Sequence, residues 1–414
     1  MSSPTGVHPR ARPPGPRSVL VTLCVTEIVS WGVLYYAFPV LLTQICRDTG
    51  WPAFSVTAAF SAGLVTSAVA GMVVGPLLDR HGPRWIMTGG SVLAVAALLA
   101  VIAAPNYGCF VAAWVVAGVA MSGVFYAPAF AALTRFFAPN AVRALTVLTL
   151  VAGFASTVFA PLTAALASHL DWRSTYLALA VLLAVITIPA HLLGLRRPWP
   201  AVAHHPHPVQ APTLTARTRS FLALTAAFAL SALASYAVVV NLVPLMAQRG
   251  ISTQAAAVAL GLGGVGQVLG RLAYQYLVRR FGVVTRTVLI MAVVAASTVL
   301  LGVFTSLAAL IAVAIVAGMV RGVMTLLQAT AVTERWGVTH YGYLSGILSA
   351  PVMFATALGP FIGAALATVL HGYAAMFVAL GAVAGLAAVL AAATSVPAPY
   401  PTRVSVTPKE PSPR

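Results

Sequence analysis

Three ionisable side chains lie well inside long apolar runs of this sequence: Glu27, Arg271 and Arg321. A charged group in the middle of a membrane-spanning helix costs at least about 2.5–3.5 kcal/mol on insertion scales, so each is a functional candidate by default. A guanidinium presents a fixed fork of donors that suits a carboxylate. Two arginines against one glutamate would give a binding cavity a net positive charge. The pattern therefore predicts a small anionic substrate such as a carboxylate.

Glu27 begins a stripe of candidate binding residues. Trp31 and Tyr35 follow it at i+4 and i+8, which places all three on one helix face. The stripe predicts a cavity wall with a polar end and two aromatic faces. In the alternative interpretation, Glu27 faces cytoplasmic water or pairs with an arginine.

The arginines and one amide also have two interpretations each. We predict that Arg271 binds substrate or takes part in coupling; otherwise it pairs with Glu27 or with helix carbonyls. Arg321, in the run GMVRGVM, and Asn241 are candidates for ligand binding, and otherwise both form hydrogen bonds between helices.

The composition requires these residues to lie in a membrane. Apolar residues make up 60% of the 414 residues, only 7% are charged, and the mean hydropathy is +0.96. Soluble domains carry about 25% charged residues, so the composition excludes a soluble enzyme, a disordered chain and a nucleic-acid-binding domain. The apolar runs are long and lack a period of two, which predicts an all-α integral membrane protein.

Twelve runs are long enough to span a bilayer, and each half of the chain holds six of them. The expected spans are Val19–Leu42, Phe54–Leu78, Trp85–Ala103, Tyr107–Leu133, Ala144–Ser168, Thr175–Leu195, Phe221–Met246, Ala255–Leu277, Thr287–Phe304, Leu307–Val332, Leu344–Leu370 and Tyr373–Ala393. The first run resembles a signal peptide, but it is longer than a signal-peptide core, so we interpret it as a retained span.

The basic residues orient the spans. With the N-terminus in the cytoplasm, 18 of the 23 Lys and Arg residues, Arg286 and Arg335 among them, fall in cytoplasmic segments, three in outer loops and two within spans. Because positive charge gathers on cytoplasmic loops, we expect both termini inside and contacts between arginines and anionic lipid. Lys409 is the only lysine. This preference for arginine over lysine indicates a GC-rich bacterial genome, and so a multi-pass protein of the plasma (inner) membrane.

A linker divides the chain into its two halves. The expected boundaries are 1–18 for a cytoplasmic tail, 19–195 for the N-terminal half, 196–220 for a cytoplasmic linker, 221–394 for the C-terminal half and 395–414 for a second cytoplasmic tail.

The linker and the cysteines give no sign of a metal site or a cofactor. His204, His205 and His207 have no cysteine or carboxylate beside them, so we expect a solvated linker and no metal. The sequence lacks a phosphate-binding loop for ATP, and we expect no cofactor. Cys46 and Cys109 both fall near the outer face, and the sequence leaves open whether they pair.

The two halves match at an offset of about 200 residues. GPLLDRHG at 75–82 corresponds to QYLVRRFG at 275–282. Two six-span halves of this kind describe a secondary transporter with its substrate site between them, near the middle of the membrane. Further matches join Tyr36 to Tyr236, Leu42 to Leu242 and Gly118 to Gly318.

The loop between the second and third spans carries the most specific motif. GPLLDRHGPR, from Gly75 to Arg84, is similar to the loop signature of the major facilitator superfamily, and DWRSTY resembles the family's start of the sixth span. The resemblance covers essentially the whole chain and implies the twelve-helix transporter fold. YYAFPVLLTQICRDTGW and the Gly-Arg at Arg271 look most like the monocarboxylate/oxalate branch. This finer resemblance implies that Arg271 binds a substrate carboxylate.

The same motif implies a conformational latch. Gly75 would let another helix approach, and Asp79 would meet the positive N-terminus of the eleventh span, near Gly342. Arg80 and Arg84 would then pair with Asp79 or hold lipid phosphates. Such a latch, with Gly82 in its turn, would stabilise the state closed to the cytoplasm. In the second copy of the motif, Arg279 stands at the position of the acid, so the latch would be one-sided.

These observations predict a secondary active transporter that moves a small organic anion by alternating access, with protons as the coupling ion. The first alternative is proton-coupled efflux of drugs or natural products, because aromatic walls beside Glu27 suit cationic or amphipathic ligands. The second is a membrane receptor or scaffold without transport. We expect the protein to function as a monomer, to bind no nucleic acid and to have no enzymatic activity.

Overall fold

The computed structural model describes residues 16–137, 141–199, 213–336 and 341–394. Twelve helical segments in this part of the chain are long and apolar enough to cross a membrane, which confirms the predicted all-α membrane fold. Cys46 and Cys109 are both free. His204, His205 and His207 lie outside the described residues, as does the tail from residue 395.

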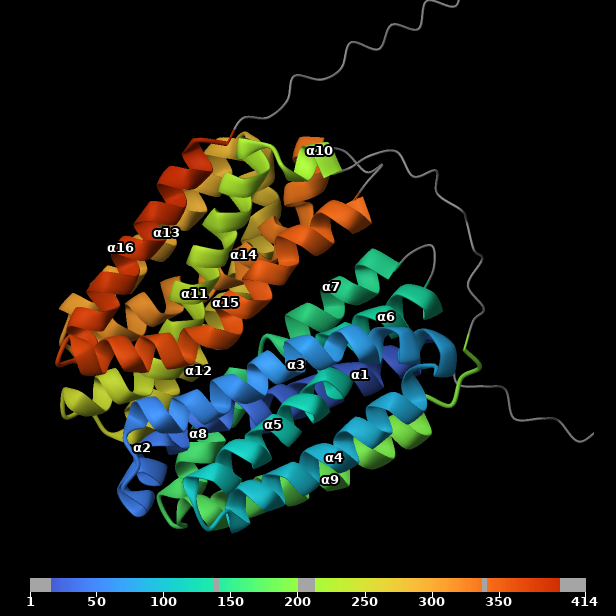
Figure 1. The fold of residues 1–414 in the computed structure, drawn as a ribbon, viewed down its shortest axis with the longest axis vertical. Helices are drawn as coiled ribbons and strands as arrows, with labels where there is room; N and C mark the ends of the chain where they lie inside the picture. Colours follow the sequence, from blue (N-terminus) through green and yellow to red (C-terminus); the bar gives the residue numbers. More distant parts are fainter. Residues whose placement is uncertain (1–15, 138–140, 200–212, 337–340, 395–414) are drawn as a thin grey trace, which may run out of the picture.

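The spans are built from the helices labelled in Figure 1. In chain order they are α1 (Pro16–Trp31), the π-helical turn η1 (Gly32–Tyr36), α2 (Ala37–Thr49), α3 (Ala53–His81), α4 (Pro83–Ala103), α5 (Tyr107–Val124), α6 (Tyr126–Phe136), α7 (Ala141–Ala152), α8 (Ala155–Ala167), α9 (Trp172–Gly194), α10 (Thr213–Ala216), α11 (Arg219–Gln248), α12 (Thr253–Arg280), α13 (Val283–Val303), α14 (Leu307–Trp336), α15 (Tyr341–Val369) and α16 (Tyr373–Ala392).

Prolines account for two interruptions in the N-terminal half. Pro39 follows η1, and its ring and missing N–H disfavour an ordinary helical bond to the carbonyl of Tyr35, four residues earlier. Pro128 acts in the same way on the fourth span. There Phe125 takes an extended backbone (φ −88°, ψ −169°) between α5 and α6. Turns of π-helix and broken helices of this kind often lie at functional sites.

The fifth span is interrupted as well, at Gly153 and Phe154 between α7 and α8. In the C-terminal half, the corresponding spans are the single helices α11, α14 and α15. Glycine is a weak helix former, and backbone freed inside a membrane needs neighbouring groups or a ligand to satisfy it. The three interruptions therefore mark the middle of the N-terminal half as a candidate site.

Glycines bring equivalent helices of the two halves into backbone contact. A Cβ on Gly118 of α5 would overlap the carbonyl of Gly63 in α3, and a Cβ on Gly318 of α14 would overlap the carbonyl of Gly263 in α12. Small residues allow this close packing of helices in lipid. The four positions are related by the predicted offset of 200 residues. The same pair of helices therefore packs through equivalent glycines in each half.

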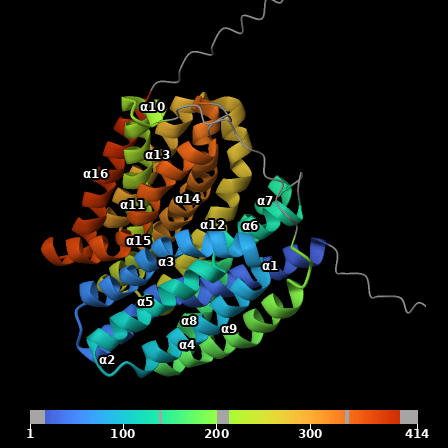
Figure 2. The same cartoon turned by 45° about the vertical axis from the view of Figure 1, so that its right-hand side comes forward.

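The two halves meet at one end of the bundle and diverge toward the other (Figures 1 and 2). We call the end at which α1 begins and α16 ends the terminal end, and the opposite one the loop end. Thr157 Oγ1 donates to the carbonyl of Gly261 (2.8 Å), and Phe361 N donates to Ser61 Oγ (3.2 Å). Both bonds join the halves in the loop-end parts of their spans.

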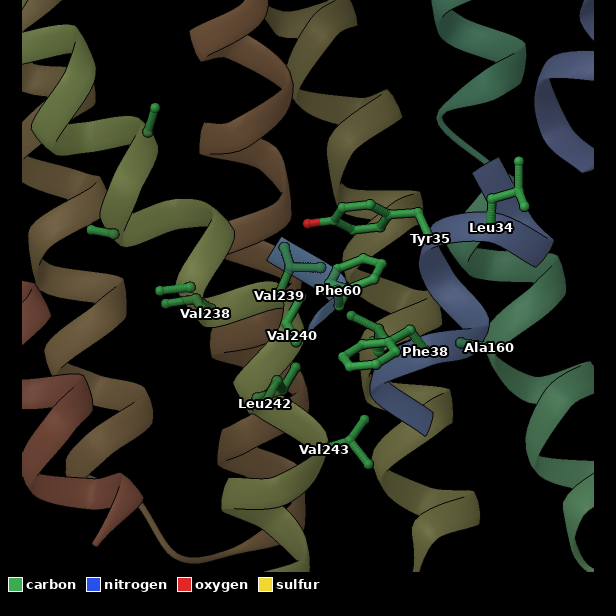
Figure 3. Packing of buried hydrophobic residues seen from close by; sticks show 14 of the residues in the cluster. Leu34, Tyr35, Phe38, Phe60, Ala160, Val238, Val239, Val240, Leu242 and Val243 are labelled. Carbon is green, nitrogen blue, oxygen red and sulfur yellow. The ribbon is translucent and has the colours of Figure 1, made fainter. Parts of the chain in front are cut away.

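Aromatic and branched side chains close the loop-end contact between the halves. Phe38 and Phe60 stack with their ring centres 4.1 Å apart. In Figure 3, these rings and Tyr35 face Val239 and Val240 of α11. All five side chains belong to the main buried cluster. The halves therefore seal against each other on the loop-end side of Tyr35.

Two arginines that the charge pattern assigned to cytoplasmic loops are buried instead. Arg286 is 2% exposed and forms an ion pair with Glu334, and Arg335 is 5% exposed and donates to Thr287 Oγ1 at 2.9 Å. Both arginines lie in the end turns of helices, because α13 begins before the apolar run and α14 continues beyond it. The helices continue because these polar groups satisfy one another between them.

Arg249 closes the loop end of α13. Its guanidinium donates to the carbonyls of Leu301 (2.9 Å), Gly302 (2.5 Å) and Phe304. Bonds from a charged donor contribute about 1.5–3 kcal/mol each when they are well formed. We therefore expect Arg249→Ala to lower the stability of the protein by about 1–3 kcal/mol, measured as a fall in Tm. Arg47→Ala, at an exposed loop-end arginine, is the control and should change Tm little.

Candidate functional site

Glu27 is fully buried in α1, and the indole of Trp31 binds its carboxyl group. Trp31 Nε1 donates to Glu27 Oε2 at 2.9 Å, and Oε1 has no hydrogen-bond partner among the described residues. Glu27 and Trp31, which their spacing of four residues placed on one helix face, are thus joined by a direct hydrogen bond. Within this part of the chain, the carboxyl forms no ion pair. The burial argues against the interpretation that Glu27 faces water.

Trp31 also leads into a cluster of aromatic rings from both halves. Its ring stacks on Phe125 at 4.0 Å between centres, and Tyr126 lies 5.2 Å away. Tyr35 meets Tyr236 of α11 edge to face at 6.5 Å, across the junction of the halves. Trp31 and Tyr35 lie edge to face with their ring centres 5.5 Å apart, and Tyr35 is only 2% exposed.

Sequence reasoning missed three members of this cluster of rings as site residues: Phe125, Tyr126 and Tyr236. A single aromatic residue in an apolar run looks the same whether it packs in a core or faces a cavity. Two signals were present. Pro128 marks the break that places Phe125 and Tyr126 at the start of α6, and Tyr236 matches Tyr36 in the repeat.

Arg271 is 6% exposed and reaches across the junction from α12. Its Nη1 donates to the carbonyl of Thr149 in the last turn of α7, and its Nε has no partner among the described residues. A positive group is favoured at a helix C-terminus. Gly153 leaves room for this contact, because a Cβ there would lie 3.2 Å from Nη1. The structure thus agrees with the alternative interpretation of Arg271, in which it bonds to a helix carbonyl.

Arg321 of α14 is 7% exposed, and its Nε and Nη2 have no hydrogen-bond partner in the described part of the chain. It lines a cavity of about 10 Å³, room for about one water molecule. The other walls are apolar side chains of α11, α12 and α13, such as Val238, Leu260 and Leu301. The hydroxyls of Tyr35 and Tyr236 lie near enough to interact electrostatically with Arg321.

The charged groups and the tyrosines converge. The Tyr126 hydroxyl lies within electrostatic range of both Arg271 and Glu27, and the Tyr236 hydroxyl lies within range of both Arg271 and Arg321. Tyr36 lies beside Tyr35, with the ring centres 5.2 Å apart. We call this group the central cluster; its members are Glu27, Trp31, Tyr35, Tyr36, Phe125, Tyr126, Tyr236, Arg271 and Arg321. The N-terminal half supplies the carboxyl and most of the rings. The C-terminal half supplies both guanidinium groups, so the arrangement can hold an anion on one side and a flat apolar group on the other.

Asn241 is occupied in packing. Its Nδ2 donates to the carbonyl of Ala237 at 2.9 Å and to that of Pro360 in α15 at 3.4 Å. Gly363 makes room for the amide, since a Cβ there would come within 2.5 Å of Nδ2. These contacts match the interpretation of Asn241 as a residue that bonds between helices.

The loop motif is only partly described. Gly82 makes its turn at a positive φ of 76°, and Arg84 Nε donates to the carbonyl of Leu192 at the end of α9 (2.9 Å). Arg80 is exposed. A Cβ on Gly75 would meet nothing within 4 Å, so the helix approach predicted there is absent from this state. The side chain of Asp79 lies outside the described residues.

Comparisons with known proteins agree with the fold. A family model described as Major Facilitator Superfamily matches residues 23–282 and 224–414. The uncharacterized MFS-type transporter YcxA of Bacillus subtilis (strain 168) is 28% identical over 148 residues, which cover 34% of this chain and 35% of that protein. Monocarboxylate transporter 13 of Bos taurus is 27% identical over 255 residues, 60% of this chain and 56% of that protein. The matches thus span about a third and just over half of these relatives.

Solved structures with the same fold cover nearly the whole chain. A bacterial homologue of the human lysosomal transporter Spinster, in an inward-facing and unoccupied conformation, has a TM-score of 0.69 and 14% identity over 92% of this chain and 97% of that one. Its inward-facing, occupied form matches equally well. At this level of identity, the likeness shows the fold alone.

Proposed function

This chain belongs to the Major Facilitator Superfamily of membrane transporters, and we propose that it is a secondary active transporter of a small organic anion, most simply a carboxylate. Family membership makes it a multi-pass membrane transporter and not an enzyme. The proposal adds the substrate class, coupling to protons, and the central cluster as the place where substrate and proton bind.

One observation carries the substrate class: two buried guanidinium groups lie near the same tyrosine, Tyr236, at the junction of the halves. Among the described residues, neither Arg271 nor Arg321 has an ion pair, and each leaves at least one donor unpaired. A buried charge is costly unless it is paired. An anionic substrate would supply the missing partner. The similarity to a protein named a monocarboxylate transporter supports the same class.

Glu27 is the candidate for carrying the proton. An ionised carboxyl that is buried without a cationic partner is costly, and a negative Glu27 would also repel an anion bound at the arginines. Binding a proton and an anion together would remove both penalties. Intramembrane carboxylates of this kind commonly belong to proton relays.

Transport by purified protein in liposomes tests the proposal. Labelled carboxylates should accumulate when the lumen is made alkaline, and a proton ionophore should abolish the accumulation. If a lipophilic cation is moved and carboxylates are not, the protein is an exporter of drugs or natural products. The absence of transport for every probe would favour a receptor or scaffold.

We further propose that the terminal end is cytoplasmic and that the chain lies in the plasma (inner) membrane with both termini inside. The asymmetry of basic residues supports this orientation. Periplasmic-reporter fusions at Gln210 and Pro401 are expected to be inactive. Reporter activity at both positions would reverse the orientation. With the termini inside, the state seen here, sealed at the loop end, is inward-facing.

The loop motif would control how long this state lasts. We expect Asp79→Asn to leave the fold intact and to shift the population further toward the inward-open state. The lost contact with a helix N-terminus is worth about 0.3–1 kcal/mol, and up to about 2 if partly buried. Labelling of single cysteines from each side of the membrane measures the shift. Unchanged labelling together with unchanged transport would show that Asp79 is only a loop charge.

A further inference from the structure

We propose that the substrate is an aryl carboxylate, a molecule with one carboxylate and one flat aromatic ring. This inference rests on the proposed function and narrows it from small organic anions to one chemical class. It depends on how the two halves divide the central cluster between them.

The N-terminal half presents ring faces. Trp31, Tyr36 and Tyr126 are each partly exposed, although they lie in the middle of their spans at the junction of the halves. Trp31 is held in place on both sides, by Phe125 stacked on its face and by Glu27 at its indole nitrogen. Tyr126 is backed by Phe130, stacked at 5.1 Å. The rings of Trp31 and Tyr126 are therefore held by their neighbours, and each keeps some exposed surface for a ligand.

The C-terminal half presents positive charge to the same space. Arg271 of α12 reaches the carbonyl of Thr149 in α7, and Arg321 of α14 lines the cavity beside Val238 of α11. Tyr236 lies within electrostatic range of both guanidinium groups, and Tyr126, on the opposite half, lies within range of Arg271. A ligand that contacts both halves thus meets a guanidinium on one side and a ring face on the other.

A small aliphatic acid would satisfy only the guanidinium side. Aromatic rings prefer offset-stacked or edge-to-face partners, and such pairs contribute beyond the apolar area they bury. A polyhydroxy acid would use the tyrosine hydroxyls, but it would leave the ring faces against polar groups. An aryl carboxylate matches both sides at once. It would also bridge the halves in the middle of the membrane, where a substrate must be held during alternating access.

Three acids separate these possibilities: phenylacetate, cyclohexylacetate and gluconate. The first two share their charge and nearly their size, and differ in whether the ring is aromatic. We expect the purified full-length protein to bind phenylacetate about 2- to 12-fold more tightly than cyclohexylacetate, by calorimetry, and to bind gluconate most weakly. Tyr126→Leu should lower the ratio of the first two. Tyr126→Phe, which keeps the ring, should preserve it. Tyr276→Leu, at a 68% exposed tyrosine of α12, is the control and should preserve the ratio.

The outcomes distinguish this inference from the proposed function. Equal binding of phenylacetate and cyclohexylacetate would overturn the aryl class and leave anion transport standing. Preference for gluconate would overturn it in favour of recognition by hydroxyls. If none of the acids binds while a lipophilic cation does, both the aryl class and the anion function fail. A preference for phenylacetate that Trp31→Leu, Tyr36→Leu and Tyr126→Leu each leave unchanged would also overturn the proposal, because the ring faces named here would not be its cause.

Discussion

Arg271→Ala is expected to abolish transport of the anion while leaving the protein in the membrane. Removing one partner of a buried charge pair costs about 2–5 kcal/mol in other complexes, so substrate affinity should fall by about 30-fold or more. Arg271→Lys keeps the charge but loses the fork of donors. We therefore expect the lysine variant to bind more weakly and to retain some transport. Calorimetric affinity and uptake into liposomes measure both effects.

Two further variants separate a substrate role from a structural one. Arg279→Ala changes an exposed arginine of the same helix and should preserve transport. The double variant Glu27→Gln/Arg271→Ala should not recover activity, because Arg271 bonds to the carbonyl of Thr149 and the described residues show no ion pair between Arg271 and Glu27. If Arg271→Ala lowers Tm but binds the anion normally, the arginine only caps α7. Arg321 would then be the better candidate for anion binding.

The fold was predictable because membrane insertion leaves a strong trace in the sequence. Twelve apolar runs, with basic residues between them, specify twelve helices. The same signal did not predict that Arg286 and Arg335 are buried within helices, since an apolar run ends where polar residues begin, whereas a helix continues as long as its polar groups find partners. The ion pair of Arg286 with Glu334 joins residues 48 positions apart in sequence, and hydropathy carries no information on such pairs.

The contacts of the candidate site could be predicted where both residues lie on one helix. Contacts between residues of different helices could not. The spacing of Glu27, Trp31 and Tyr35 placed them on a common face, and the bond between Glu27 and Trp31 follows from that spacing. The contact of Arg271 with Thr149 needs the halves to be docked, so no local pattern indicates it. Tyr126 joins the cluster because the fourth span breaks just before it.

Glu27→Gln is expected to uncouple anion movement from the proton gradient. Glutamine has nearly the shape of glutamate and keeps an oxygen that can accept the indole N–H of Trp31, now at 2.9 Å from the carboxyl. It remains neutral at every pH, so it mimics the protonated carboxyl permanently. Exchange of labelled for unlabelled anion across the membrane should therefore continue. Accumulation driven by an alkaline lumen should disappear, and uptake into liposomes under each condition measures both.

Glu334→Gln is the matched control for this loss of coupling, because it removes a carboxyl that is only 21% exposed and that forms an ion pair with Arg286 of α13. That variant should lose stability and retain proton-driven accumulation. Trp31→Phe keeps a ring on Phe125 but removes the N–H that holds Glu27, so we expect it to weaken coupling without abolishing exchange. If Glu27→Gln still accumulates anion against its gradient, the proton binds elsewhere. If it loses exchange and accumulation together, Glu27 serves the substrate site itself, since a residue needed only for the proton would leave exchange intact.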